Sequence, residues 1–173
     1  DRTMERFGLS SKELPNFRTL HSLCHRMLGL SRSSVLNGNS LREFNDIMGL
    51  RLSGRSDMEE GSISMLSKDD RLSFIEGLSR LRCVPLRDQW HQHYDEDIDW
   101  FALERFQKGL YQFKQARGLH DFTDMLDLCV QKQLAPKLDV MFVDEAQDLS
   151  PLQWKLVELL ANNSKRVYIA GDD

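Results

Sequence analysis

The sequence predicts an α/β fold that is mostly α-helical by residue count. Apolar residues recur at helical spacing through most of residues 20–130. The last part of the chain, residues 137–173, changes to two short β-forming runs on either side of one helix. A chain of 173 residues is long enough to bury the core of one domain, or of one domain with an insertion.

The N-terminal side is predicted to contain a short extended segment at residues 16–20 and a helix at residues 21–30. One face of this helix is apolar, with Leu20, Leu23, Cys24, Met27 and Leu28. Gly29 lies near its end. Residues 31–39 are rich in Ser, Asn and Gly, so we expect a loop there.

Residues 40–117 show a helical pattern with polar breaks and no strand signal of useful length. Breaks at residues 54–61 and at Pro85 separate three expected helices. Their apolar faces are marked by Leu41, Phe44, Ile47 and Met48, then by Leu72, Ile75, Leu78 and Leu81, and then by Ile98, Phe101, Leu110 and Phe113. The segment is therefore predicted to be an all-helical module.

A further helix is predicted after Asp121, which is a plausible N-cap, and Pro136 ends this element. Its apolar positions follow the i, i+3, i+4, i+7 spacing of an amphipathic helix. They are Phe122, Met125, Leu126, Cys129 and Val130.

The C-terminal part is predicted to be a strand–helix–strand unit. Residues 138–143 form a short apolar run that indicates a buried strand. Residues 166–170 are predicted to form the next strand. Between them, residues 150–153 have the composition of a helix start, with Ser as N-cap, Pro next and Gln three residues after the cap. This order predicts parallel strands joined by a crossover helix, and such sheets bind ligands at the carboxyl ends of their strands.

An acidic pair, Asp144 and Glu145, directly follows the first strand. A carboxylate at a strand tip can hold Mg²⁺ through its water shell, and a second one can orient or deprotonate an attacking water. The alternative is a polar turn that ends a buried strand. The second strand also ends in acidic residues, Asp172 and Asp173, which favours a nucleotide–magnesium site over the turn.

Composition and charge exclude several classes of protein. The 40% hydrophobic share is too high for a disordered chain, and no run of about 18 apolar residues predicts a membrane span. The three cysteines form no CxxC pair, which argues against a disulfide framework or a zinc site. The net charge of −4 divides unevenly, with +4 on residues 1–56 and −8 on residues 57–173. If the chain binds DNA, its N-terminal third is the better candidate.

Three C-terminal strings resemble superfamily 1 DNA helicases of the UvrD/Rep/PcrA type. Residues 143–148 read Val-Asp-Glu-Ala-Gln-Asp and are followed by Leu-Ser-Pro-Leu-Gln at residues 149–153. The first of these strings, residues 143–148, resembles motif II of that family, which is its Walker B box. Residues 170–173 read Ala-Gly-Asp-Asp and resemble the opening of motif III.

Upstream segments agree with this resemblance in the same order. Residues 18–28 resemble the Thr-Phe-His-Gly/Ser segment that leads into a helix, and residues 118–126 resemble the Gly-Leu-x-Asp-Phe-x-Asp/Glu-Leu-Leu segment. Residues 4–8 are similar to the last part of motif Ia. Residues 31–117 match only by position and helical character, as the variable domain 1B.

The resemblance implies a partial RecA-like P-loop NTPase domain with a mainly helical insertion. Residues 1–30 and 118–173 would belong to RecA-like domain 1A, and residues 31–117 would form domain 1B. The implied activity is that of an ATP-dependent DNA helicase or translocase, which uses Mg²⁺ and ATP, moves on single-stranded DNA and acts in repair or replication. The implied partners are single- or double-stranded DNA and the rest of the helicase chain with its second RecA-like domain, in a bacterial cytoplasm and without a membrane.

The resemblance also implies roles for individual residues. Asp144 would be the metal-linked carboxylate and Glu145 would activate the hydrolytic water. The implied nucleotide site consists of Asp144, Glu145, Gln147, Asp148, Gly171 and Asp172. Gln147 and Asp148 would also link this site to the DNA-facing elements.

Thr19 and His21 would lie near the path of single-stranded DNA. Each also has an ordinary structural alternative, which is a strand-end hydroxyl for Thr19 and a helix-start hydrogen bond or core imidazole for His21. Asp121 is interpreted as an N-cap rather than a direct contact. The His and carboxylate run at residues 91–99 lacks helical ligand spacing, so we do not expect metal there, and Trp90 and Trp100 are expected in the core.

Departures from the family pattern define the alternatives. The sequence contains no Gly-Lys-Ser/Thr, so it lacks a phosphate-cradling loop, and the later helicase motifs are also missing. We therefore expect a fragment that does not hydrolyse ATP by itself. The alternatives are a helicase–nuclease subunit of the AddA or RecB type, a catalytically silent DNA-binding or regulatory module, and an unrelated P-loop ATPase. The pair Gln147 and Asp148 and the element at residues 19–21 argue against the last of these.

Overall fold

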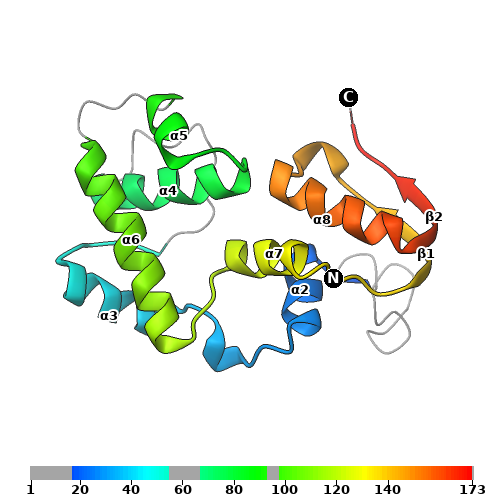
Figure 1. The fold of residues 1–173 in the computed structure, drawn as a ribbon, viewed down its shortest axis with the longest axis horizontal. Helices are drawn as coiled ribbons and strands as arrows, with labels where there is room; N and C mark the ends of the chain where they lie inside the picture. The colour runs from blue at the N-terminus through cyan, green and yellow to red at the C-terminus, as the bar shows by residue number, and fades with distance from the viewer. Residues whose placement is uncertain (1–16, 55–66, 93–97, 173) are drawn as a thin grey trace.

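The computed structural model describes residues 17–54, 67–92 and 98–172. Its elements form two lobes that lie side by side (Figure 1). The helical lobe contains α3 (Gly38–Met48), α4 (Lys68–Leu81), α5 (Leu86–Gln92) and α6 (Trp100–Arg117). The strand lobe contains α2 (Leu20–Met27), α7 (Phe122–Gln131), β1 (Leu138–Val143), α8 (Pro151–Asn162) and β2 (Ser164–Ile169). Two short 3₁₀ turns, η1 (Arg32–Ser34) and η3 (Ala146–Asp148), complete the described elements.

Each lobe has its own hydrophobic core. In the helical lobe, Phe44 of α3 contacts both Phe106 and Phe113 of α6 through edge-on and tilted ring pairs. The buried members of this core are Phe44, Leu72, Ile75, Leu86, Ile98, Leu103, Phe106, Leu110, Phe113 and Leu119. The buried members of the other core are Cys24, Met125, Leu126, Cys129, Met141, Val143, Ala146, Leu152, Leu156, Val157 and Leu160.

The predicted strand–helix–strand unit is confirmed. Strands β1 and β2 pair in parallel, with Leu138 opposite Ser164 and Val143 opposite Ile169. Helix α8 between them starts as the sequence predicts, since Ser150 and Gln153 form a reciprocal capping box with Pro at the first turn.

The prediction that β1 is a buried strand holds for one face only. Met141 and Val143 are buried against the helices. Val140 and Phe142 point to the other face and are exposed, and the ring of Phe142 stacks on that of Tyr168 in β2 with centroids 5.0 Å apart. Since residues alternate between the two faces of a strand, the described helices cover one side of this sheet.

The two chain crossings between the lobes run side by side. Residues 34–36 leave the strand lobe, and His120 lies on the return segment. His120 N–H donates to the Ser34 carbonyl at 2.8 Å, and Leu36 N–H donates to the His120 carbonyl at 2.9 Å. Gly118, at φ 61°, ends α6 in the left-handed conformation that turns the chain back.

Several helix predictions were wrong in detail. Helix α5 was missed, since Pro85 was interpreted only as an interruption. Helix α3 begins at Gly38, inside the predicted loop, because Asn37 forms a capping box with Ser40. Helix α6 begins at Trp100 after an Asp99 N-cap, so Ile98 lies before the helix, although it is buried.

Three residues assigned to apolar helix faces are exposed. They are Ile47 in α3, Phe101 in α6 and Phe122 in α7, with exposures of 58%, 74% and 53%. Helical spacing identifies a face, but within the described residues the neighbouring elements leave more than half of each of these side chains uncovered. In the described ranges, no helix is both long enough and apolar enough to span a membrane.

Some sequence-based interpretations lie outside the described residues. These are the motif Ia resemblance at residues 4–8, most of the break at residues 54–61, the centre of the acidic run at residues 93–97, and Asp173.

Candidate functional site

The predicted acidic pair lies at the carboxyl end of β1. Asp144 and Glu145 are both exposed, and the Glu145 N–H donates to Asp144 Oδ1 at 3.2 Å. Glu145 adopts a left-handed backbone conformation, with φ 53° and ψ 44°, which non-glycine residues rarely adopt. Strained backbone of this kind concentrates at functional sites, and here it directs the chain into η3 immediately after the strand.

Gln147 connects the ends of the two strands. Its Nε2 donates to Glu145 Oε2 at 2.6 Å, and its Oε1 accepts from the Asp172 N–H at 3.2 Å. The backbone supports the same link, since the Ala146 N–H donates to the Ala170 carbonyl at 3.0 Å. The structure thus brings Glu145, Gln147 and Asp172 together. We call these three residues, with Asp144 and Gly171, the acidic tip.

Gly171 allows this close approach. A Cβ atom at this position would lie 2.7 Å from Gln147 Oε1 and 3.2 Å from the Gln147 backbone nitrogen. Any larger residue would therefore displace the Gln147 amide. Glycine is favoured here by the proximity of Gln147 and not by a left-handed backbone angle.

Asp148 lies at the end of η3, where its N–H donates to the Glu145 carbonyl at 3.1 Å. Its side chain is exposed, close in sequence to the start of α8. Asp148 was also predicted to belong to the nucleotide site. Its backbone is hydrogen-bonded to the acidic tip, but its side chain makes no contact there among the described residues.

The donor chemistry of the acidic tip fits a partly hydrated magnesium ion. Among the described residues, no group of three or more His, Cys, Asp or Glu side chains is arranged to hold a metal ion. Mg²⁺ usually keeps several waters and binds through one or two carboxylates together with substrate phosphates. One exposed carboxylate at a strand end, Asp144, suits that mode and does not suit a closed cage of protein ligands.

Thr19 and His21 lie at the start of α2, apart from the acidic tip. Thr19 is the N-cap of this helix, and its Oγ1 accepts from the Ser22 N–H at 3.3 Å. The ring of His21 meets the edge of Phe122 at the start of α7, with centroids 5.4 Å apart. Burial lowers the pKa of His21 below its ordinary value, so its imidazole is neutral near pH 7.

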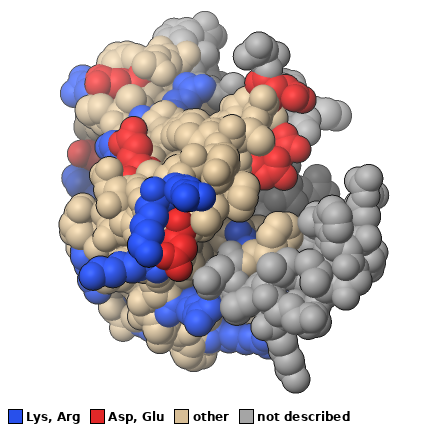
Figure 2. All heavy atoms as spheres, turned by 90° about the vertical axis from the view of Figure 1, so that its right-hand side faces the viewer, with Lys and Arg blue, Asp and Glu red and all other residues tan. Residues whose placement is uncertain are grey.

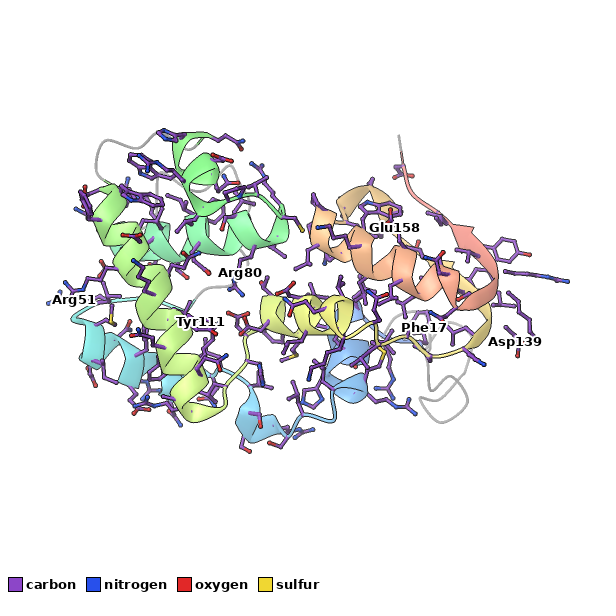
Figure 3. All side chains as sticks on the ribbon, in the orientation of Figure 1. Phe17, Arg51, Arg80, Tyr111, Asp139 and Glu158 are labelled. Atoms are coloured by element: carbon purple, nitrogen blue, oxygen red, sulfur yellow. The ribbon has the colours of Figure 1, made fainter. Side chains whose placement is uncertain are left out.

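Two features of this region were missed from the sequence. The exposed ring of Phe122 beside His21 was assigned to the apolar face of its helix. Arg80, which is labelled between the lobes in Figure 3, reaches the α7 cap from the helical lobe, and so does Lys114. The Asp121–Asp124 spacing signals a capping box, but no local pattern reveals partners that lie 41 and 7 positions away along the chain.

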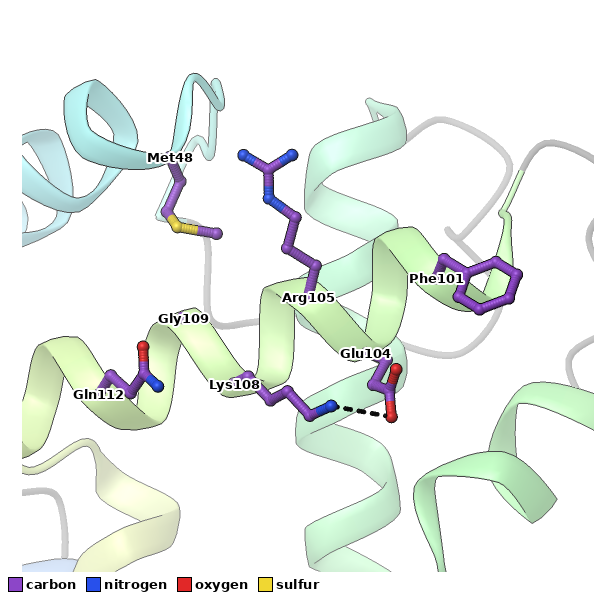
Figure 4. A pocket seen from close by; sticks show the side chains of 7 residues that line it. All are labelled: Met48, Phe101, Glu104, Arg105, Lys108, Gly109 and Gln112. Carbon is purple, nitrogen blue, oxygen red and sulfur yellow. Dashed lines mark ion pairs between the residues drawn. The ribbon is translucent and has the colours of Figure 1, made fainter.

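A groove on the helical lobe is distinct from the acidic tip. It has a volume of about 420 Å³ and lies between α6 and Met48 of α3 (Figure 4). Gly109 is one of the lining residues, and a Cβ there would lie 2.6 Å from Met48 Cε. On the end of the molecule that bears the strands, acidic and basic side chains are interspersed (Figure 2), so the described part of that face has no large field of one sign.

The comparison with family models gives a match along the whole chain. The matching model is the UvrD/REP helicase N-terminal domain, and it covers residues 1–173. The chain belongs to the UvrD/REP helicase N-terminal domain family. The resemblance found in the motifs is thereby confirmed at the level of the family.

A curated relative of this UvrD/REP family chain is "Putative ATP-dependent DNA helicase YjcD" of Bacillus subtilis (strain 168). The two are 25% identical over 189 residues, which include 100% of this chain and 24% of the relative. The chain therefore spans about a quarter of the length of the curated relative it matches. No solved structure matches the chain.

Proposed function

We propose that this chain is part of an ATP-dependent DNA helicase or translocase that couples Mg-ATP hydrolysis to movement on single-stranded DNA. The observation that carries the proposal is the acidic tip, where two exposed carboxylates lie at a strand end and one of them, Glu145, is joined through Gln147 to the end of the neighbouring strand. The family and the printed name of the relative support the same activity.

Within this proposal, Asp144 holds the magnesium ion that accompanies ATP. When bound, Mg²⁺ neutralises negative charge on the nucleotide phosphates. Glu145 orients the attacking water and accepts its proton, since its carboxylate is exposed and is held by the Gln147 amide. Gly171 and Asp172 then begin the segment through which the nucleotide site communicates with DNA, with Gln147 and Asp148 as the link.

We further propose that residues 1–30 and 118–173 belong to a RecA-like domain 1A and residues 31–117 to a helical domain 1B. The separate hydrophobic cores of the two lobes and the adjacent chain crossings at Ser34–Leu36 and His120 support this division. Thr19 and His21 then face the single-stranded DNA path, and a second RecA-like domain elsewhere in the protein completes the ATP site.

The sequence of these 173 residues holds no Gly-Lys-Ser/Thr loop, so we propose that the chain alone does not hydrolyse ATP. The same observation favours a second candidate, a catalytically silent DNA-binding or regulatory module. A helicase–nuclease subunit of the AddA or RecB type is a variant of the first candidate, since it uses the same kind of motor.

The test is ATP hydrolysis by the complete protein, with Mg²⁺ or with a chelator, and with or without single-stranded DNA. A motor shows magnesium-dependent hydrolysis that rises with DNA, and Asp144→Asn lowers it by about 10²-fold or more. The silent module shows no hydrolysis in any condition, and that result would overturn the proposal. Hydrolysis by the isolated 173-residue chain would refute the claim that it is inactive alone.

A further inference from the structure

Five charged side chains meet between the two lobes. They are Glu76 and Arg80 from α4, Lys114 from α6, and Asp121 and Asp124 from the start of α7. We call this group the inter-lobe cluster. Arg80 lies between the lobes in Figure 3, where α4 faces α7.

Arg80 contributes the largest number of contacts. Its Nη2 lies 2.7 Å from Asp121 Oδ2 and its Nη1 lies 2.9 Å from Asp124 Oδ1, while its Nε lies 2.8 Å from Glu76 Oε1. One guanidinium therefore pairs with a carboxylate of its own helix and with two of the other lobe. The planar fork of arginine suits such multiple pairing.

Lys114 reaches the same two aspartates from α6. Its Nζ lies 2.6 Å from Asp121 Oδ2 and 2.7 Å from Asp124 Oδ2. The lysine side chain is only 7% exposed, so its ammonium has been removed from water and held by these carboxylates. By contrast, Lys108 on the same helix is 66% exposed and pairs with Glu104 at 3.1 Å (Figure 4).

The electrostatics agree with this geometry. Burial alone would raise the pKa of Asp121, but the charges of Arg80 and Lys114 outweigh it and hold that pKa well below its ordinary value. Burial, together with the nearby charge of Asp121, raises the pKa of Glu76, and the charges of Arg80 and Lys114 only partly offset this. Asp121 is thus held as an anion by cations of the helical lobe.

Asp121 also caps α7. Its Oδ1 accepts from the Asp124 N–H at 2.8 Å, and Asp124 Oδ2 accepts from the Asp121 N–H at 2.9 Å. The next residue is Phe122, whose ring contacts His21. The position of the helical lobe and the geometry of the α2–α7 surface therefore depend on the same two carboxylates.

We propose that Arg80 and Lys114 are positioning residues that hold the helical lobe on the start of α7 and thereby keep the His21–Phe122 surface in its DNA-binding arrangement. This inference rests on the proposed function for the DNA path. In some proteins buried ion pairs fix one unique arrangement of the chain, and that is the role assigned to Arg80 and Lys114 here.

The experiment uses the complete protein and measures ATP hydrolysis against the concentration of single-stranded oligothymidylate. Lys114→Met removes the buried cation, and Lys108→Met is the matched control on the exposed side of the same helix. We expect Lys114→Met to raise the half-saturating DNA concentration about tenfold, with maximal turnover and the KM for ATP changed by less than about twofold. Lys114→Arg should recover most of the loss, and Lys108→Met should behave as the wild type.

A role confined to stability would lower the unfolding temperature of Lys114→Met and leave the half-saturating DNA concentration unchanged, and this result would overturn the proposal. If Lys114→Met does not fold, Asp121→Asn takes its place, because it keeps a capping oxygen and loses the charge. The same rise in half-saturating DNA is expected, and wild-type behaviour of folded Asp121→Asn would equally contradict the proposal.

Failure of the proposed function gives a different result, namely no DNA stimulation in the wild type. In that case, amide hydrogen exchange measures directly whether Lys114 holds the start of α7 in place. Amides of the first turn of α7 should exchange faster in Lys114→Met than in Lys108→Met. Equal exchange in the two variants would refute the inter-lobe role.

Discussion

Carboxylates occupy two contrasting environments in this molecule. In the inter-lobe cluster, Glu76, Asp121 and Asp124 are largely buried, and each is paired with Arg80, with Lys114 or with both. In the acidic tip, Asp144 and Glu145 are exposed, and within the described part of the chain no lysine or arginine pairs with them. Glu145 is held only by the neutral amide of Gln147.

The contrast separates structural from ligand-binding carboxylates. A buried carboxylate needs a cation or several hydrogen-bond donors, since an unpaired charge there costs several kcal/mol. An exposed carboxylate at a strand end costs little by itself and keeps its lone pairs available for a metal ion or a water. Substitutions in the cluster should therefore lower stability as well as weaken the response to DNA, whereas substitutions in the tip should chiefly lower catalysis.

The largest expected effect on stability is that of Arg80→Met. The substitution leaves Glu76 without its ion-pair partner and leaves Asp121 and Asp124 with Lys114 alone, so we expect the free energy of unfolding to fall by about 3–5 kcal/mol. Urea denaturation followed by circular dichroism measures it. Lys108→Met, at an exposed pair, should change the free energy by less than about 0.5 kcal/mol.

A similar loss in both variants would mean that burial does not distinguish the two pairs. A small loss in Arg80→Met alone would mean that water reaches the cluster and screens it.

A smaller effect is expected for Gly171→Ala. The new Cβ would displace the Gln147 amide, which breaks the link between Glu145 and Asp172. The link is exposed, so the free energy of unfolding should fall by less than about 1 kcal/mol, while ATP turnover of the complete protein falls. Denaturation and steady-state kinetics separate the two quantities.

Gly77→Ala is the matched control for this substitution. Gly77 lies within α4, and a Cβ there meets nothing within 4 Å. Alanine should stabilise the helix by up to about 1 kcal/mol and leave turnover unchanged. If Gly77→Ala lost ATP turnover to the same extent, the loss in Gly171→Ala could not be attributed to the contact between Gly171 and Gln147.

The smallest expected effect is that of Glu76→Gln, although it also removes a charge from the cluster. Glu76 has a raised pKa in the folded state, so its ionisation opposes folding as the pH rises through that pKa. Glutamine removes this cost and keeps an acceptor for Arg80. We expect the free energy of unfolding of Glu76→Gln to differ from that of the wild type by less than about 1 kcal/mol. The difference should shift in favour of the variant as the pH rises from 5 to 8.

Asp121→Asn should show the opposite dependence. Its lowered pKa contributes stability that is present above the ordinary value of 3.8 and is lost as the pH falls below it. The loss of unfolding free energy in Asp121→Asn, relative to the wild type, should therefore become smaller as the pH falls below 3.8. A deficit for Glu76→Gln at pH 8 as large as that of Arg80→Met would contradict the account of the cluster.

Local signals predicted the strand lobe well. The caps at Asp121 and Ser150, the apolar run of β1 and the parallel pairing with β2 depend on neighbouring residues, and all are present. The acidic pair was placed at the end of β1 for the same reason. Its link through Gln147 to Asp172 could be expected only as proximity, since a side-chain hydrogen bond depends on rotamers.

The helical lobe and its junction were less predictable. Exposure of Phe101 and Ile47 depends on which helix faces are covered, which is a tertiary property that periodicity does not contain. The partnership of Arg80 with Asp121 joins residues 41 positions apart. Neither residue carries a sequence signal for the other, so the cluster becomes visible only in the folded chain.

The central claim is that the acidic tip is the hydrolytic centre of the complete protein, and Glu145→Gln tests it most directly. This variant keeps the shape of the side chain and loses its charge and basicity, and Glu158→Gln, on the exposed side of α8, is the matched control (Figure 3). We predict that Glu145→Gln lowers ATP turnover by about 10²–10⁴-fold with ATP binding retained, while Glu158→Gln turns over as the wild type. Normal turnover in a folded Glu145→Gln protein would contradict the account.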